Sequence, residues 1–176
     1  EIGLLGSNHF VNNPTIDLEQ IAAMINLDMI GRLRDDSVYV SGTGTGTGFP
    51  EMLTELNDTG LRLDYSDSGM GGSDHMSFNI KEVPVLFFFS GLHTDYHKPT
   101  DTAEKIESDG AIMVLQLAYS VIDHLANDVD RPLYTQVEEE RPISGSGGGY
   151  GPYFGSIPDF REVDGVMFAD INQGSP

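Results

Sequence analysis

Short apolar runs alternate along this chain with longer stretches in which apolar and polar residues mix. The run VPVLFFF at 83–89 has the length of a buried strand. Residues 21–31 are apolar on both sides, as expected of a strand covered by helices on both faces. Further strand-like runs occur at 37–42 and 61–65. An alternation of this kind favours an α/β domain.

The mixed stretches predict helices. The longest covers about 107–127, and its expected apolar stripe consists of Ile112, Leu115, Val121, Ile122 and Leu125. Just before it, Asp101 and Glu104 have the spacing of a capping box. Shorter helices are expected at 3–13, at 50–60 with Gly60 closing the helix, and at 73–80 with Ser73 or Asp74 as the N-cap.

The character of the chain changes after Asn127. The stretch EEERPISGSGGGYG at 138–151 is polar and rich in glycine, as flexible linkers are. We therefore expect a first domain at 1–130, a linker at 131–148 and the start of a second domain at 149–176. That last segment has too few residues to form a core alone.

Composition restricts the function. The formal net charge of −19 argues against nucleic acid or an anionic membrane as partner, and no apolar run approaches the roughly 20 residues of a membrane span. Because the chain has no cysteine, any metal must be held by His, Asp and Glu. The chain opens on Glu rather than Met, so it is expected to be a fragment of a longer protein.

The glycine-rich run SGTGTGTGF at 41–49 suggests a phosphate-binding loop. The dinucleotide fingerprint requires glycines at its first, third and sixth places, and Thr47 or Phe49 occupies the sixth place here. No Gly-Lys-Ser/Thr follows either. A mobile loop between a strand and a helix is the better interpretation.

Candidate chemistry gathers where predicted strands end, and these ends are where open α/β sheets form their sites. Asp28 lies in an apolar strand, where a charge is costly unless it is paired or bound to a metal. Asp74 and His75 open a helix, and the loop from His93 to Asp101 follows the strand at 83–89. Each residue also has a plainer interpretation, as a helix cap or a polar loop residue.

Four motifs occur in a recognisable order: EIGLLGS, INLDMIGR, GGSDHMSF and DYHKPTDT. In this order and spacing they resemble the di-zinc aminopeptidases, whose superfamily includes the glutamate carboxypeptidases and glutaminyl cyclases. The similarity covers about residues 1–127, and the chain looks like the later half of such a peptidase domain. The resemblance implies a mixed, mostly parallel sheet flanked by helices.

The resemblance also implies a site with two zinc ions. Glu1 and His97 match the ligands of one ion, and Asp28 matches a carboxylate ligand of the other. Tyr96 matches a tyrosine that in some members donates to the developing oxyanion. The family's general base would directly precede Glu1, so the 176-residue chain is expected to be inactive by itself.

Three further residues resemble the groups that orient ligands and helix ends in this family. They are Asp74, His75 and Asp101, for which a capping or structural role is an equal alternative.

The tail, YGPYFGSIPDF followed by GVMFADINQGSP, is similar to the first part of a bacterial PDZ domain. Such domains bind extended chain ends by strand addition, so a C-terminal peptide is the expected ligand there.

The function implied is a zinc-dependent aminopeptidase that acts on peptides and is exported to the periplasm or secreted. Two alternatives stay open. A glutaminyl cyclase-like acyltransferase would have the same fold and one working zinc. A scaffold or binding protein of this fold would have lost catalysis. Two zincs in the intact domain would favour the peptidase.

Overall fold

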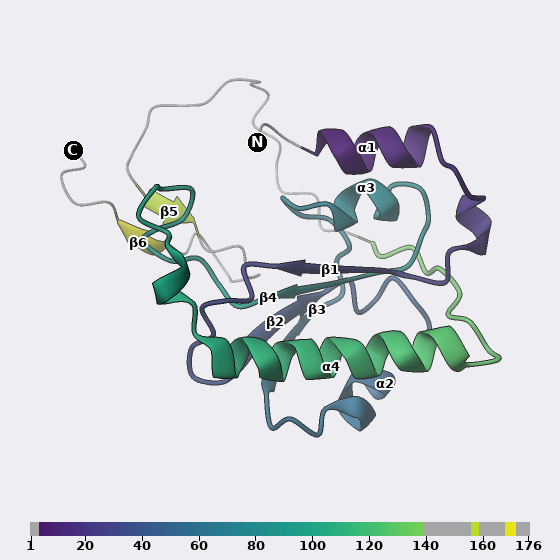
Figure 1. Ribbon diagram of the computed structural model, residues 1–176. Coiled ribbons are helices and arrows are strands. Elements are labelled where there is room, and N and C mark those ends of the chain that lie inside the picture. The colour runs from purple at the N-terminus through teal and green to yellow at the C-terminus, as the bar shows by residue number, and fades with distance from the viewer. Residues whose placement is uncertain (1–3, 139–155, 159–167, 172–176) are drawn as a thin grey trace.

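Four strands form the main sheet in the part of the chain that the computed structural model describes, residues 4–138, 156–158 and 168–171 (Figure 1). They are β1 (Met24–Asp28), β2 (Ser37–Ser41), β3 (Arg62–Ser66) and β4 (Val85–Phe89), in the spatial order β1-β4-β2-β3. The pairs β1–β4 and β2–β3 are parallel, and β2–β4 is antiparallel. The predicted mixed, mostly parallel sheet is confirmed, and each strand lies within or at the edge of its predicted run.

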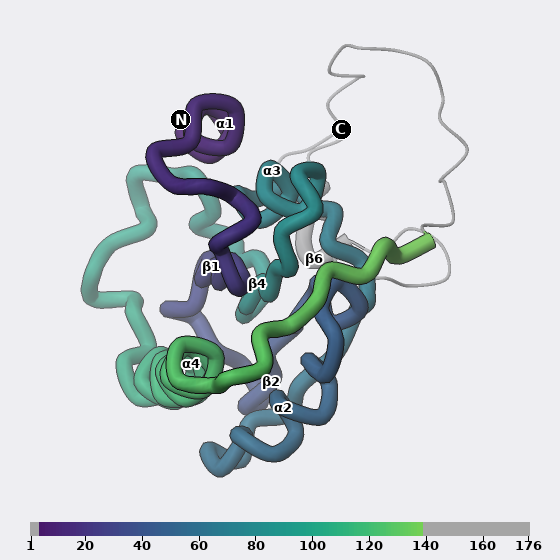
Figure 2. Tube along the Cα trace, turned by 90° about the vertical axis from the view of Figure 1, so that its right-hand side faces the viewer, coloured from purple at the N-terminus to yellow at the C-terminus, as the bar shows by residue number. Residues whose placement is uncertain are grey.

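Helices cover both faces of this sheet. Figure 2 shows α1 (Leu5–Asn12) and α3 (His75–Asn79) on one side, with α2 (Phe49–Leu56) and α4 (Ser108–Asn127) on the other. Two single turns of 3₁₀-helix, η1 (Leu18–Gln20) and η2 (Ala103–Lys105), lie in the connections. The arrangement is the layered α/β architecture that the alternation of runs predicts.

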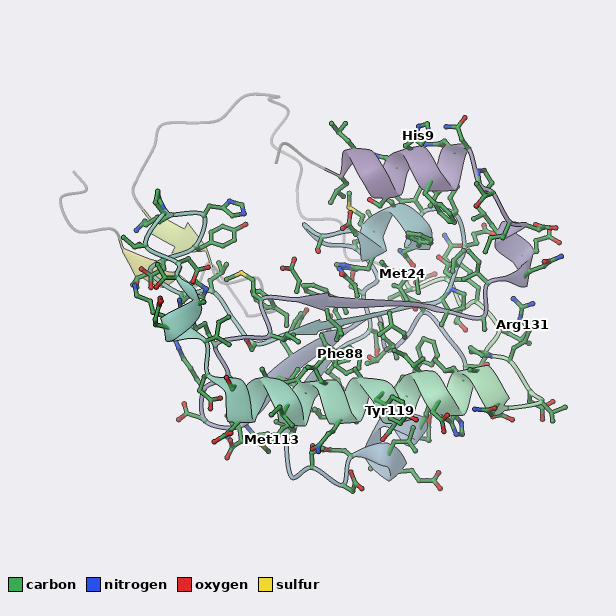
Figure 3. All side chains as sticks on the ribbon, in the orientation of Figure 1. His9, Met24, Phe88, Met113, Tyr119 and Arg131 are labelled. Carbon is green, nitrogen blue, oxygen red and sulfur yellow. The ribbon has the colours of Figure 1, made fainter. Side chains whose placement is uncertain are left out.

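The main core fills the space between the sheet and the pair α2 and α4. Alternate strand residues point into it, including Val38 and Val40 of β2 and Leu86 and Phe88 of β4, all of them fully buried. Figure 3 shows Phe88 in the layer between the sheet and α4. The remaining strand residues point to the opposite face, toward α3, and this leaves that face available for polar side chains.

The apolar stripe expected on α4 is right for Val121 and Leu125, which pack against the core, and wrong for its other three residues. The helix buries Val114, Leu117, Ala118 and Val121, whereas Ile112, Leu115 and Ile122 are 50, 46 and 47% exposed. Each set recurs on one helical face. The sheet contacts only one of them, and the burial of that set stabilises the packing by roughly 1.5–3 kcal/mol for each large side chain.

β1 is less buried than expected. All five of its residues are partly exposed, because β1 is the end strand of the described sheet and has β4 as its one neighbour there. The expectation of a strand buried on both faces holds instead for β4, in which every residue is buried.

The predicted N-cap of α3 is confirmed in position but makes no capping bond, and the predicted capping box at Asp101 is wrong. Asp74 has the N-cap position of α3 but makes no capping hydrogen bond, and the Ser73 hydroxyl donates to Asp28 instead. Asp101 begins no capping box, since its carboxylate pairs with Arg32. Glu107 caps α4, accepting a hydrogen bond from the N–H of Gly110 at 2.8 Å.

The glycine-rich run is packed into the protein, so the expectation of a mobile loop is wrong. Thr43 and Thr45 are each 1% exposed. The Thr45 hydroxyl accepts a hydrogen bond from the N–H of Val85 at 2.9 Å. Gly42 has φ +84°, and a Cβ there would lie 2.2 Å from the carbonyl oxygen of Val85. The run needs glycine at this position because the turn passes directly against β4.

The C-terminal part contributes two short strands, β5 (Ser156–Pro158) and β6 (Phe168–Ile171), which pair antiparallel. Most of the predicted linker and PDZ-like segment lies outside the described residues. The division at 1–130, 131–148 and 149–176 therefore stays a prediction. In the described part of the chain, no helix is both long enough and apolar enough to cross a membrane.

Candidate active site

A cavity of about 430 Å³ lies over the α3 side of the sheet, a size typical of small-ligand pockets. Its floor consists of alternate strand residues, Asn26 and Asp28, Tyr39 and Ser41, and Phe87 and Phe89. Residues 70–75 and the loop after β4 complete its walls. The period of two along each strand explains why these side chains share one face while their neighbours enter the core.

Asp28, the last residue of β1, has a carboxylate held by a chain of hydrogen bonds. The Ser73 hydroxyl donates to its Oδ2 at 2.8 Å, and the Asn26 amide donates to the Ser73 hydroxyl at 2.8 Å. These bonds fix the orientation of the Asp28 carboxylate, which lines the cavity. A carboxylate oriented in this way is suited to bind a cation.

His75 is a fully buried wall of the same cavity. Its ring stacks on Phe87 with 4.3 Å between centroids, and the Asn26 amide nitrogen lies 3.4 Å from its Nδ1. Burial lowers the pKa of His75, against the opposing effects of the Met70 backbone and the carboxylates of Asp28 and Asp74. The ring is therefore a neutral imidazole at neutral pH.

Tyr96 and His97 reach the cavity from the loop that follows β4. Their rings stack with 3.8 Å between centroids, and His97 has φ +54°, which is rare outside glycine. Burial raises the pKa of Tyr96, and the negative charge of Asp28 adds to the shift. The phenol accordingly keeps its proton and can donate a hydrogen bond inside the cavity.

Charged side chains brace this loop outside the cavity. Asp95 accepts hydrogen bonds from Lys105 and Thr100, each at 2.7 Å, and these lower the pKa of Asp95 to about 2. Arg32 pairs with both Asp95 and Asp101. His93 is buried 3.9 Å from Asp101, and its pKa is lowered first by burial and then by the charge of Arg32.

Comparison with known proteins identifies this arrangement. Residues 1–122 match the family model described as peptidase family M28. The chain belongs to peptidase family M28.

Curated and solved relatives of this M28 chain are aminopeptidases by name. Probable leucine aminopeptidases of Arthroderma benhamiae and Trichophyton verrucosum are each 30% identical over 132 residues, covering 69% of this chain and 36% of theirs. The Legionella pneumophila LapA aminopeptidase has a TM-score of 0.59 and 25% identity, covering 72% of this chain and 37% of its own. The chain spans about a third of the length of these relatives.

The fold is shared more widely. The zinc aminopeptidase BSAP of Bacillus subtilis has a TM-score of 0.58 and 24% identity, with 69% of this chain and 32% of its own covered.

Most of the site residues predicted for this M28 chain come together. Five of them line the one cavity: Asp28, Asp74, His75, Tyr96 and His97. Asp101 does not line it, because its carboxylate is drawn to Arg32. Glu1 lies outside the described residues.

Sequence reasoning assigned no role to Asn26 and took Ser73 only for a possible cap. The signal for Asn26 was available, since it stands two residues before Asp28 in a strand and so shares its face. No local signal joins Ser73 to Asp28, which is 45 residues away.

The donors in the cavity are of the kinds that zinc prefers, carboxylate oxygen and imidazole nitrogen. Asp28 fits the role best, with one oxygen oriented by Ser73. Within the described ranges, no three His, Asp or Glu side chains lie close enough together to hold a metal ion. These residues are therefore suitable ligands but do not form a complete metal site.

Proposed function

We propose that this chain forms part of the active site of a zinc-dependent aminopeptidase that removes N-terminal residues from peptides. The observation that carries the proposal is the convergence of an oriented carboxylate, Asp28, and the Tyr96–His97 loop on one cavity of an M28 chain. The names of its curated relatives and solved neighbours support the aminopeptidase activity and the zinc.

The proposed ligands are Asp28 for one zinc ion, and His97 together with Glu1 for a second. Two zinc ions held there would acidify a water molecule and polarise the scissile carbonyl of the peptide. The general base would be a carboxylate of the full-length protein outside the described residues.

The chain's own residues would supply orientation and charge stabilisation. Ser73 and Asn26 hold the Asp28 carboxylate, and the neutral ring of His75 closes the wall behind them. Tyr96 would donate its phenolic hydrogen to the carbonyl oxygen as negative charge develops there. A donor placed in advance of the reaction stabilises the transition state without reorganisation.

The experiment uses the full-length protein, aminoacyl-anilide substrates and metal analysis by mass spectrometry. We expect two zinc ions per chain, hydrolysis of the substrates, loss of activity after chelation and its return with zinc. One zinc ion with cyclisation of N-terminal glutamine would indicate the cyclase instead. Peptide binding without zinc or turnover would indicate a scaffold protein. The PDZ-like identity of 149–176, its peptide ligand and export stay predictions.

Replacing Ser73 with alanine is expected to weaken zinc binding about 10- to 100-fold, the usual effect of losing a group that orients a ligand. The variant removes the donor to Asp28 and takes from the Asn26 amide its acceptor at 2.8 Å, which leaves only the longer contact with His75. Competition with a chelator measures the affinity. Ser77→Ala is the matched control, since Ser77 is also in the α3 region but its hydroxyl pairs with Ser7 at 3.0 Å. Equal affinities in both variants would contradict the prediction.

A further inference from the structure

Arg32 joins two carboxylates that lie on either side of His97 in the sequence. Its guanidinium lies 3.5 Å from Oδ2 of Asp95 and in close contact with Oδ1 of Asp101. The Arg32 side chain is 18% exposed and that of Asp95 is 15% exposed, so water screens this pair less than an exposed one. The planar, forked guanidinium can hold both carboxylates at once, which a lysine ammonium does less well.

The segment between these carboxylates is also closed on itself. The N–H of Lys98 donates to the carbonyl of Asp95 at 2.9 Å, and the N–H of Asp101 donates to the carbonyl of Lys98 at 3.0 Å. Thr100 donates to the Asp95 side chain at 2.7 Å. Residues 95–101 thus form a compact loop, and Arg32 binds both of its ends.

The loop holds His97 in an unfavourable backbone conformation. The φ of +54° is uncommon for a non-glycine residue and persists where the surrounding contacts maintain it. Arg32, four residues after Asp28 and just beyond β1, is the side chain that pairs with both ends of the loop, while Lys105 and Thr100 also bind Asp95 at one end. Arg32 therefore connects the strand that carries Asp28 to the loop that carries Tyr96 and His97.

We propose that Arg32 is a positioning residue, which places the Tyr96–His97 loop over the Asp28 cavity through its ion pairs with Asp95 and Asp101. The part of this inference that concerns zinc binding and catalysis rests on the proposed function. The effect of Arg32 on how rigidly the loop is held does not depend on that function and can be measured without zinc. Arg32 is not among the residues that line the cavity, so the proposed effect passes through the two aspartates that it pairs with.

The test compares Arg32→Ala with Arg34→Ala in the full-length protein. Arg34 is the matched control, because it is an exposed arginine of the same turn and no ion pair joins it to a carboxylate in the described ranges. Three quantities are measured: amide hydrogen exchange of a peptide covering 90–105 in metal-free protein, zinc affinity by chelator competition, and kcat and KM at saturating zinc.

For Arg32→Ala we expect roughly tenfold faster exchange in the loop, 10- to 100-fold weaker zinc binding, and a lower kcat with little change in KM. Added guanidinium should restore part of the affinity, and Arg32→Lys should fall between the wild type and the alanine variant. Arg34→Ala should match the wild type. If Arg32→Ala does not fold, Asp101→Asn removes one of the two pairs and should shift all three quantities in the same direction by less.

Unchanged loop exchange together with unchanged zinc affinity in Arg32→Ala would overturn the proposal. Faster exchange spread evenly over the sheet would also overturn it, since Arg32 would then stabilise the fold in general. If the wild type neither binds zinc nor cleaves peptides but loop exchange still rises in Arg32→Ala, the proposed function fails and the positioning role stands.

Discussion

Replacing His97 in the full-length protein is expected to remove at least one of two zinc ions and to abolish most peptidase activity. The loss should exceed the 10- to 100-fold effect typical of groups that only orient ligands. The reason is that the imidazole is the proposed direct ligand and that Asp28, the other proposed ligand among the described residues, serves the second ion. Mass spectrometry of the purified protein and turnover of an aminoacyl-anilide provide the measurements.

The choice of substitution matters because His97 has φ +54°. Alanine is strained at that angle, whereas asparagine adopts it more readily. His97→Asn therefore separates the loss of the imidazole from a change of the backbone. His9→Ala is the control, since His9 is an exposed histidine on α1 and lines no wall of the cavity. Two zinc ions and normal turnover in His97→Asn would show that His97 is not a ligand.

Replacing Tyr96 with phenylalanine is expected to lower kcat by about 10²–10³-fold, the usual loss when one donor to an oxyanion is removed. Zinc content and KM should change little, because the donor acts on charge that appears in the transition state and not in the bound substrate. Burial and the carboxylate of Asp28 raise the pKa of Tyr96, so the hydroxyl of the wild type stays protonated across the neutral range.

Steady-state kinetics on zinc-loaded full-length protein measures this effect. Tyr119→Phe provides the matched control. Tyr119 is 69% exposed and lies on α4, across the sheet from α3 and the cavity (Figure 3). If Tyr96→Phe turns over like Tyr119→Phe, Tyr96 only packs against His97 and the loop.

The strands and the long helix could be predicted because their signals are local. VPVLFFF is apolar at every position and forms β4, in which every residue is buried. The face of α4 could not be predicted in the same way. Ile112, Leu115 and Ile122 recur on one helical face, as Val114, Leu117 and Val121 do on another, and the choice between the two faces depends on where the sheet lies.

The sequence was also a poor guide to the partner of a polar side chain that could bond either to a nearby helix end or to a residue distant in sequence. Ser73 and Asp101 each stand where a helix cap is expected, yet Ser73 donates to Asp28 and Asp101 pairs with Arg32. A buried or charged partner binds such a group more strongly than an exposed backbone N–H does. The glycine-rich run likewise has the composition of a mobile loop but packs against Val85.

The order and type of the elements, and the four motifs that indicate the family, were determined by the sequence alone, because periodicity and motif spacing are properties of neighbouring residues. The cavity was decided by the tertiary structure. Asp28, Ser73 and His97 are separated by tens of residues, and only the alignment of β1 with β4 and the packing of α3 on the sheet bring them to one cavity. The same packing brings Arg32 into contact with Asp95 and Asp101. Contacts between segments that are distant in sequence depend on the whole fold, so the residues adjacent to each segment do not reveal them.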